Sequence, residues 1–128
     1  MDILLLGVGL QGRAALYDLA ASPQVERIIA ADREIESLDA LIRDEGYEGR
    51  VESHPFDASD PSALDALMRT GVDVAIDLLP VAFIESVGVA AVRNGVHLVN
   101  TFYVPVGLER LDDAARAAGV SILPEFGL

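Results

Sequence analysis

The sequence predicts an α/β protein with a doubly wound parallel sheet of six strands in the order 3-2-1-4-5-6. Two observations carry this prediction. Short apolar runs alternate with longer amphipathic stretches along all 128 residues. The first and fourth runs are apolar at nearly every position, which is typical of strands covered by helices on both faces. With right-handed crossovers, parallel strands of this kind form a doubly wound sheet.

The predicted strands are short runs dominated by aliphatic side chains. In chain order they cover residues 3–6, 27–31, 50–54, 72–78, 96–100 and 120–123. Between them, apolar residues recur at helical spacing over residues 11–21, 33–45, 61–70, 81–94 and 108–118. Glycines, which end helices readily, lie just past the last four of these helices: Gly46, Gly71, Gly95 and Gly119. Asp60 is the expected N-cap of the third helix, with Pro61 at its first position, and Pro80 opens the fourth.

The composition is that of one compact soluble domain, with 52% hydrophobic and 23% charged residues and no Cys or Trp. Nine basic residues against 21 acidic ones give a formal charge of -12, which disfavours nucleic acids and anionic membranes as partners. All nine are Arg, so a phosphate-binding lysine and Schiff-base chemistry are excluded within these residues. No targeting or membrane segment is recognised, so we expect a cytoplasmic protein. The composition is compatible with either a monomer or a homo-oligomer.

The segment GVGLQG stands between the first predicted strand and the first predicted helix. This is the place of the dinucleotide-binding fingerprint in Rossmann-type folds. Gly7 is expected to permit a tight turn, Gly9 to let a pyrophosphate approach the backbone, and Gly12 to let helix and strand pack closely. The first helical turn, with the N–H groups of Leu10 and Gln11, offers positive potential without a lysine. The alternative is a glycine-rich turn needed only for packing.

Asp32 ends the second predicted strand, where an acidic side chain accepts hydrogen bonds from the hydroxyls of the adenosine ribose. It would repel a 2′-phosphate by on the order of a few kcal/mol, which favours NAD over NADP unless a cation intervenes. Arg33 is either that cation or a solvated residue. Asp57 either holds the adenine amino group or is a turn residue. Arg13 either reaches a phosphate or, more simply, stays solvated.

The fourth strand ends in the segment DLLP, which faces the glycine turn in the predicted strand order. Leu78 and Leu79 are expected to form an apolar wall beneath a nicotinamide ring, and Pro80 to fix the turn. Asp77 is interpreted most simply as a strand-end carboxylate that reaches water.

Thr101, Phe102 and Tyr103 follow the fifth strand at the carboxyl edge of the sheet. A hydroxyl here is expected to face the ligand; the alternative is a loop that only closes over the core. His54 and His97 stand alone, without the spacing of zinc ligands or of a catalytic pair, so they are interpreted as structural. No metal site and no hydrolase are predicted.

Four segments resemble, in order and spacing, the N-terminal cofactor domain of saccharopine dehydrogenases and the related lysine 6-dehydrogenases: GVGLQG, DLLP, GVHLVNTFYV and AGVSILPEFGL. The resemblance covers essentially the whole chain. It implies that a nicotinamide dinucleotide, NAD or NADP, is lined by Gly7, Gly9, Gly12, Asp32, Leu78, Leu79, Pro80, Thr101 and Tyr103. Phe102 replaces a residue that is often small in the family, and together with Pro105 it alters the substrate side.

In that family the FGL segment leads into a substrate-binding domain, so residues 1–128 resemble a dinucleotide-binding domain without its substrate domain. The resemblance implies a parent enzyme that transfers hydride between nicotinamide and a C–N bond of an amino-acid substrate of the lysine or saccharopine type. Its acid–base group is expected outside this chain, which is expected to be inactive alone. The alternatives are a nucleotide-sensing module of the kind attached to potassium channels and transporters, and a purely structural domain of the same fold.

Overall fold

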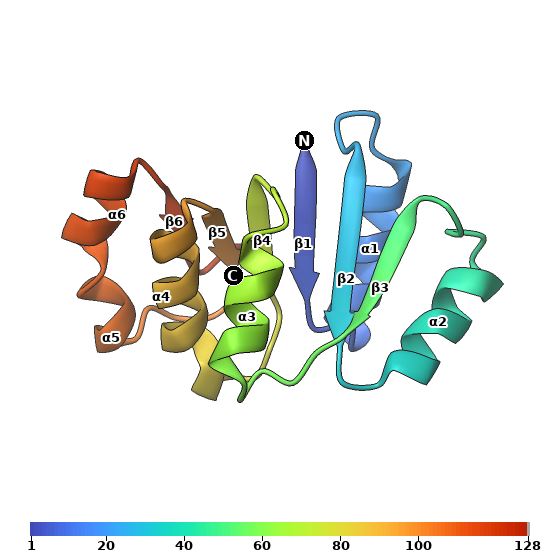
Figure 1. Cartoon of the computed structure of the whole chain (residues 1–128), viewed down its shortest axis with the longest axis horizontal. Helices are drawn as coiled ribbons and strands as arrows, with labels where there is room; N and C mark the ends of the chain where they lie inside the picture. Colours follow the sequence, from blue (N-terminus) through green and yellow to red (C-terminus); the bar gives the residue numbers. More distant parts are fainter. Residues whose placement is uncertain (128) are drawn as a thin grey trace.

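The structure is a computed structural model that describes residues 1–127. Its single sheet contains six strands: β1 (Asp2–Leu6), β2 (Arg27–Asp32), β3 (Val51–Pro55), β4 (Val74–Asp77), β5 (His97–Asn100) and β6 (Ile122–Leu123). Their order is β3-β2-β1-β4-β5-β6 and every neighbouring pair is parallel, so the predicted fold is confirmed. All carboxyl ends therefore meet at one edge, the lower edge in Figure 1.

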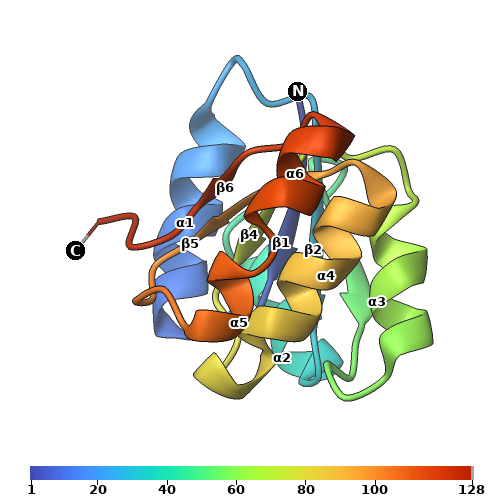
Figure 2. The ribbon, with the colours of Figure 1, turned by 90° about the vertical axis from the view of Figure 1, so that its left-hand side faces the viewer.

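Helices cover both faces of this sheet (Figures 1 and 2). They are α1 (Leu10–Ala21), α2 (Ile35–Asp44), α3 (Pro61–Met68), the 3₁₀ turn η1 (Val81–Phe83), α4 (Ile84–Asn94), α5 (Val106–Glu109) and α6 (Asp112–Ala118). Figure 2 shows α1 on one side of the sheet and α3 and α4 on the other.

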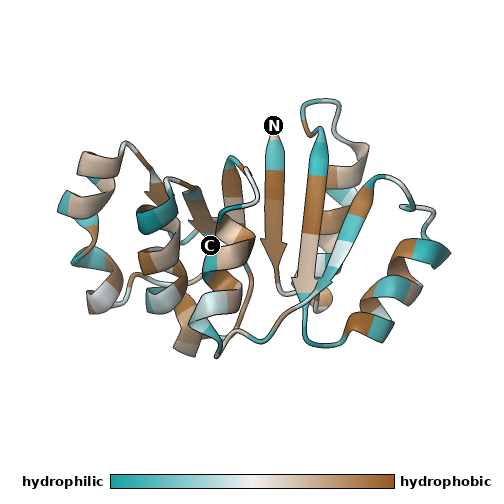
Figure 3. Cartoon of the chain, in the orientation of Figure 1, coloured by the Kyte–Doolittle hydropathy of each residue, from teal (hydrophilic) through white to brown (hydrophobic). Residues whose placement is uncertain are grey.

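Two apolar layers hold the molecule together, one on each face of the sheet. Alternate residues of a strand point to opposite faces, so Leu4 and Leu6 belong to the layer beneath α3 and α4, whereas Ile3 and Leu5 pack toward α1 and α2. Figure 3 shows the resulting concentration of hydrophobic residues in the central strands. This double coverage explains why the first strand is apolar throughout.

The predicted N-cap of α3 and the glycine caps of α4 and α6 are found in the structure, whereas the C-caps of α2 and α3 are Glu45 and Arg69, ahead of Gly46 and Gly71. The Asp60 carboxylate accepts hydrogen bonds from the N–H groups of Ser62 and Ala63, at 3.0 and 3.3 Å, and so begins α3. Gly95 and Gly119 end α4 and α6 in the left-handed conformation, with φ of 69° and 70°.

Some predicted boundaries are wrong. The helix predicted over 108–118 is two helices, because the N–H of Leu111 donates to the Leu108 carbonyl oxygen three residues back and tightens the chain between them. Pro80 precedes the 3₁₀ turn rather than opening α4 directly. The strand predicted over 72–78 shortens to β4, and that over 120–123 to β6.

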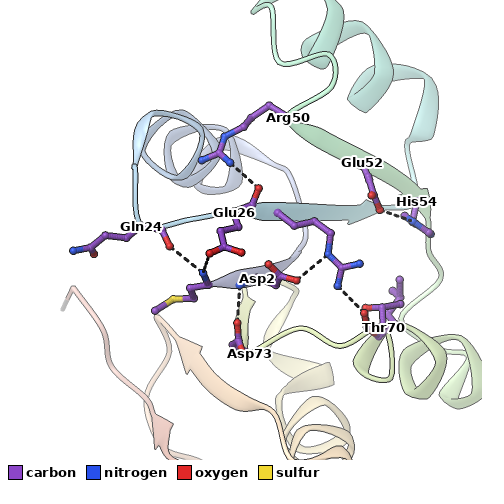
Figure 4. Close-up of polar contacts among 11 residues, drawn as sticks. Asp2, Gln24, Glu26, Arg50, Glu52, His54, Thr70 and Asp73 are labelled. Atoms are coloured by element: carbon purple, nitrogen blue, oxygen red, sulfur yellow. Dashed lines mark hydrogen bonds and ion pairs between the residues drawn. The ribbon is translucent and has the colours of Figure 1, made fainter.

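The amino ends of the strands carry a network of paired polar groups (Figure 4). Arg27 lies 3.2 Å from the Asp2 carboxylate and donates to the Thr70 carbonyl oxygen, while the N–H of Asp2 donates to Asp73 at 2.7 Å. This edge is stabilised internally and lies opposite the edge where the loops of the candidate site gather. Within residues 1–127, no helix has the length and apolar character needed to cross a membrane.

Candidate functional site

The glycine turn leaves β1 where the strand order reverses, between β2 and β4. Gly7 has a φ of 88°, a left-handed conformation that favours glycine. Its N–H donates to the Ala31 carbonyl oxygen at 2.9 Å, and a Cβ here would lie 3.0 Å from the Leu78 carbonyl oxygen. Glycine at this position thus permits both the turn and the close approach of the segment after β4.

The other two glycines of the turn differ in what a side chain would meet. A Cβ at Gly12 would collide with the Gly7 carbonyl oxygen, so this glycine allows α1 to pack against the end of β1. A Cβ at Gly9 would meet nothing within 4 Å among residues 1–127, and the φ of −74° at Gly9 is one that any residue adopts. Packing explains Gly7 and Gly12 but leaves Gly9 unexplained. The space beside Gly9 is where the sequence predicts a pyrophosphate.

The first turn of α1 presents backbone N–H groups without competition. Gly9 is the N-cap of α1, no side chain of residues 1–127 caps this turn, and the turn contains no acidic residue. The first backbone bond of the helix joins the N–H of Arg13 to the Gly9 carbonyl oxygen at 2.9 Å. The N–H groups of Leu10, Gln11 and Gly12 precede that bond, so this end of α1 can bind an anion.

Asp32 joins two turns at the carboxyl edge. Its Oδ2 accepts the Val8 N–H at 2.7 Å, and its Oδ1 accepts the Glu34 N–H at 2.9 Å. This contact with the glycine turn was not foreseen from the sequence, because it depends on how closely β1 and β2 end. An ionised carboxylate has about four lone-pair sites, so two ribose hydroxyls can still donate to it.

A cavity of about 260 Å³ lies between the glycine turn, the end of β2 and the segment after β4. It brings together eight of the predicted residues: Gly7, Gly9, Asp32, Arg33, Asp57, Leu78, Leu79 and Pro80. It is also lined by three residues that sequence reasoning missed: Phe56, Ala58 and Phe83. The sequence offered a signal for two of them, because Phe56 directly precedes Asp57 and Phe83 follows shortly after Pro80.

A second groove, of about 420 Å³, lies on the other side of Asp32 between α1 and α2. Leu10 and Arg13 line this groove and are absent from the lining of the 260 Å³ cavity within residues 1–127. The two hollows share Gly9 and Asp32.

Asp57 takes the role of a turn residue. Its Oδ1 accepts the N–H of Ser59 at 2.9 Å and the Ser59 hydroxyl at 2.7 Å, and these bonds hold the pKa of Asp57 below its ordinary value. The positive charge of Arg33 acts in the same direction. Asp57 also lines the cavity, so its predicted contact with adenine remains a prediction.

The interpretation of Asp77 as a solvated carboxylate is wrong. Its side chain is 3% exposed, because it points into the layer beneath α3 and α4. Burial raises the pKa of Asp77 to about 6, although a hydrogen bond from the Leu79 N–H at 3.0 Å acts in the opposite direction. That bond shapes the turn that carries Leu78 and Leu79 into the cavity.

The residues after β5 stand apart from this cavity. Within residues 1–127, neither Thr101 nor Tyr103 lines it, and the Tyr103 side chain is 69% exposed and packs edge-on against Phe102. Their contact with a ligand stays a prediction. The Nδ1 atom of His97 accepts the Ser121 N–H at 3.0 Å, which is the structural role expected for it. In the described part of the chain, no group of three His, Asp or Glu side chains could hold a metal ion.

Comparison with known families decides among the proteins that share this fold. The model of the family described as "Saccharopine dehydrogenase NADP binding domain" matches residues 3–123. The chain belongs to this family. The resemblance seen in the sequence is thereby confirmed, and the family supports the oxidoreductase prediction over the nucleotide-sensing alternative.

Relatives in the saccharopine dehydrogenase family align along nearly the whole chain. The saccharopine dehydrogenases [NADP(+), L-glutamate-forming] of Saccharomyces cerevisiae and Pyricularia oryzae are 29% and 34% identical to it, and each alignment covers 99% of the chain. The chain spans 27% of the length of either relative.

Solved structures agree with this assignment. The apo saccharopine dehydrogenase (L-Glu forming) of S. cerevisiae superposes with a TM-score of 0.87 over 99% of this chain and 27% of that one, at 29% identity. A biliverdin reductase from Synechocystis sp. PCC 6803 superposes with a TM-score of 0.76 over 96% of this chain and 37% of that one. It is 12% identical, so this match shows the fold alone.

Proposed function

We propose that this chain binds a nicotinamide dinucleotide and is the cofactor domain of an oxidoreductase acting on the C–N bond of an amino-acid substrate. One observation carries the proposal: among residues 1–127 nothing would contact a side chain at Gly9, and this glycine lies beside the uncapped first turn of α1 and beside Asp32. The names of the relatives support a substrate of the saccharopine type.

In this proposal each part of the site has one task. The N–H groups at the start of α1 bind the diphosphate, and Asp32 accepts the hydroxyls of the adenosine ribose. Leu78 and Leu79 exclude water from the nicotinamide side. When bound, the nicotinamide supplies or accepts the hydride.

We further infer that the substrate and the group that moves the proton are held by other parts of a longer enzyme. The relatives are nearly four times as long as this chain, which covers 27% of each. The isolated 128-residue chain is then a binding domain without turnover.

The choice between NAD and NADP rests on Asp32 in our proposal. The family description and the relatives' names carry NADP, whereas the Asp32 carboxylate, as our proposed partner of the adenosine ribose, would repel a 2′-phosphate. Arg33 lines the same cavity and is exposed, so it is the cation that could receive such a phosphate. We infer a preference for NAD that Asp32 creates and Arg33 weakens.

Calorimetric titration of the chain with NADH, NADPH, ATP and ADP tests the binding proposal. Selective binding of a nicotinamide dinucleotide is expected. Tighter binding of ATP or ADP would favour a nucleotide sensor, and no binding of any of the four would overturn the proposed function.

Two variants test the specificity. Asp32→Ser removes the charge, and we expect it to raise the affinity for NADPH relative to NADH by about tenfold, equivalent to roughly 1.4 kcal/mol. Arg33→Ala is the matched change beside it and should weaken NADPH while sparing NADH. If Asp32→Ser leaves the ratio unchanged, Asp32 does not set the preference.

A further inference from the structure

Two buried polar side chains lie on neighbouring strands at the carboxyl edge of the sheet. Asp77 ends β4 and Asn100 ends β5, and their side chains are 3% and 1% exposed. They are register partners in the parallel β4–β5 pair. Ala75 and Leu98, two residues earlier in each strand, belong to one core layer, so Asp77 and Asn100 point to that same face of the sheet.

Each of the two side chains shapes the turn that follows it. Asp77 Oδ1 accepts the Leu79 N–H at 3.0 Å, and Asn100 Oδ1 accepts the Phe102 N–H at 3.2 Å. The first turn carries Leu78 and Leu79 into the cavity, and the second begins the loop 101–103. The Phe102 bond also establishes the orientation of the Asn100 amide, because its nitrogen cannot accept a hydrogen bond.

The second polar atom of each side chain takes no part in these turn hydrogen bonds. Asp77 Oδ2 and Asn100 Nδ2 are buried, and neither has a hydrogen-bond partner among residues 1–127. A buried polar atom without a partner is costly to folding. One of these atoms is an acceptor and the other a donor. Neighbouring strands lie about 4.8 Å apart, so a small adjustment of side chains on one face brings such atoms within hydrogen-bond reach.

We propose that Asp77 and Asn100 are paired positioning residues for the nicotinamide half of the site: when the dinucleotide is bound, Asn100 Nδ2 donates to Asp77 Oδ2 and ties the turn after β4 to the loop 101–103. The proposal rests on the proposed function. Since a Cβ at Gly7 would touch the Leu78 carbonyl oxygen, the glycine turn already lies against the first of these segments. The added bond fixes the loop 101–103 relative to the glycine turn and the turn after β4.

A reciprocal exchange tests the bond, because aspartate and asparagine have the same shape. Asp77→Asn sets two NH₂ groups against each other, and Asn100→Asp sets two carboxylates against each other. The double exchange Asp77→Asn/Asn100→Asp restores one donor and one acceptor and keeps an oxygen for each turn. Affinities for NADH and for ADP-ribose, which lacks nicotinamide, are measured by calorimetry at pH 8, or with the 2′-phosphorylated forms if the chain prefers them.

We expect each single exchange to weaken NADH binding about tenfold and the double exchange to recover it to within about threefold of wild type. ADP-ribose affinity should stay within about twofold throughout, because the adenosine half does not touch the pair. Asp73→Asn is the control: it is the same chemical change at the opposite edge, where Asp73 accepts the Asp2 N–H, and should alter neither affinity.

Two results would overturn this inference alone. Losses that add up in the double exchange mean that the two side chains are not linked, and equal losses for ADP-ribose mean a general structural effect. If wild type binds no dinucleotide, the proposed function fails and the inference with it. Should a single exchange fail to fold, NMR of wild type decides. The Asn100 side-chain NH₂ signal should move downfield with NADH and stay in place with ADP-ribose, and an unmoved signal with NADH contradicts the bond.

Discussion

At Gly9 a substitution should separate the effect on folding stability from the effect on ligand binding. In the described part of the chain nothing lies within 4 Å of the position that a Cβ at Gly9 would take, and its φ of −74° is open to any residue. We therefore expect Gly9→Ala to change the free energy of unfolding by about 1 kcal/mol or less. The methyl group would occupy the approach of the pyrophosphate, so NADH affinity should fall at least about tenfold. Urea unfolding and calorimetry measure the two effects.

Gly12→Ala is the contrasting control in the same turn. Its Cβ would collide with the Gly7 carbonyl oxygen, so we expect the unfolding free energy to fall by more than about 2 kcal/mol. If Gly9→Ala binds NADH as tightly as wild type, the pyrophosphate does not approach the backbone at that residue.

Asp77 should give the stability of the protein a characteristic dependence on pH. Its pKa is raised by burial from 3.8 to about 6, so the folded state binds more protons than the unfolded state between those values. Its contribution to stability is therefore full below about pH 4 and is lost as pH rises through about 6. Between pH 5 and pH 8 this loss amounts to about 1.4 kcal/mol.

Urea unfolding of wild type and Asp77→Asn across this range measures that loss, because all other titrating groups are common to both chains. The difference in unfolding free energy between them should change by the stated amount, whatever its value at pH 8. A constant difference would mean that Asp77 has an ordinary pKa in the folded chain.

Among the elements, α1 has two ends that differ in their side-chain contacts. Its first turn is left open, whereas its last turn is covered by Arg50, which precedes β3. The Arg50 guanidinium donates to the carbonyl oxygens of Leu19, Ala20 and Ser22, at 3.4, 3.2 and 2.9 Å, and also to that of Glu26 (Figure 4). A cation at this end gives the last carbonyl groups of the helix a charged donor and interacts favourably with the helix dipole.

Arg50→Ala should therefore lower the free energy of unfolding by about 2 kcal/mol, since charged hydrogen bonds to several carbonyl groups are lost and Arg50 is only partly buried. Arg43→Ala is the control, because Arg43 is exposed and the one ion pair of its side chain within residues 1–127 is with Asp44 at 3.5 Å; it should cost less than about 0.5 kcal/mol. Denaturant unfolding tests both. Equal effects would show that the contacts of Arg50 carry no special stability.

Sequence reasoning succeeded for elements whose signals are local. Asp60, Gly95 and Gly119 act on their own backbone neighbours, so the start of α3 and the ends of α4 and α6 follow from residue type. The break between α5 and α6 could not be predicted in this way. A Cβ at Gly88 of α4 would lie within 3 Å of both Leu108 and Leu111, so the shape of that segment depends on packing against α4.

For the molecule as a whole, strand order was predictable because alternating strands and helices with right-handed crossovers leave few arrangements. The edge of the sheet that carries the site followed from that order. Two features of the site escaped prediction. Asp77 was expected in water and is buried, and Phe83, which belongs to the 3₁₀ turn before α4, lines the cavity. Burial of a strand-end side chain is decided by whichever distant segment covers it.

The first turn of α1 is uncapped, and the chain has no lysine and a formal charge of -12. These features together should give coenzyme affinity an unusual dependence on ionic strength. Backbone dipoles hold the phosphates at short range, while the net charge repels the same anion from afar. Dissolved salt screens the distant repulsion, with a Debye length of about 10 Å at 0.1 M, more than it weakens the short contact. Coenzyme should consequently bind about twofold more tightly at 300 mM than at 50 mM sodium chloride by calorimetry, the reverse of the behaviour of lysine-lined phosphate sites. Steady weakening with added salt would instead assign the phosphates to Arg13 or Arg33.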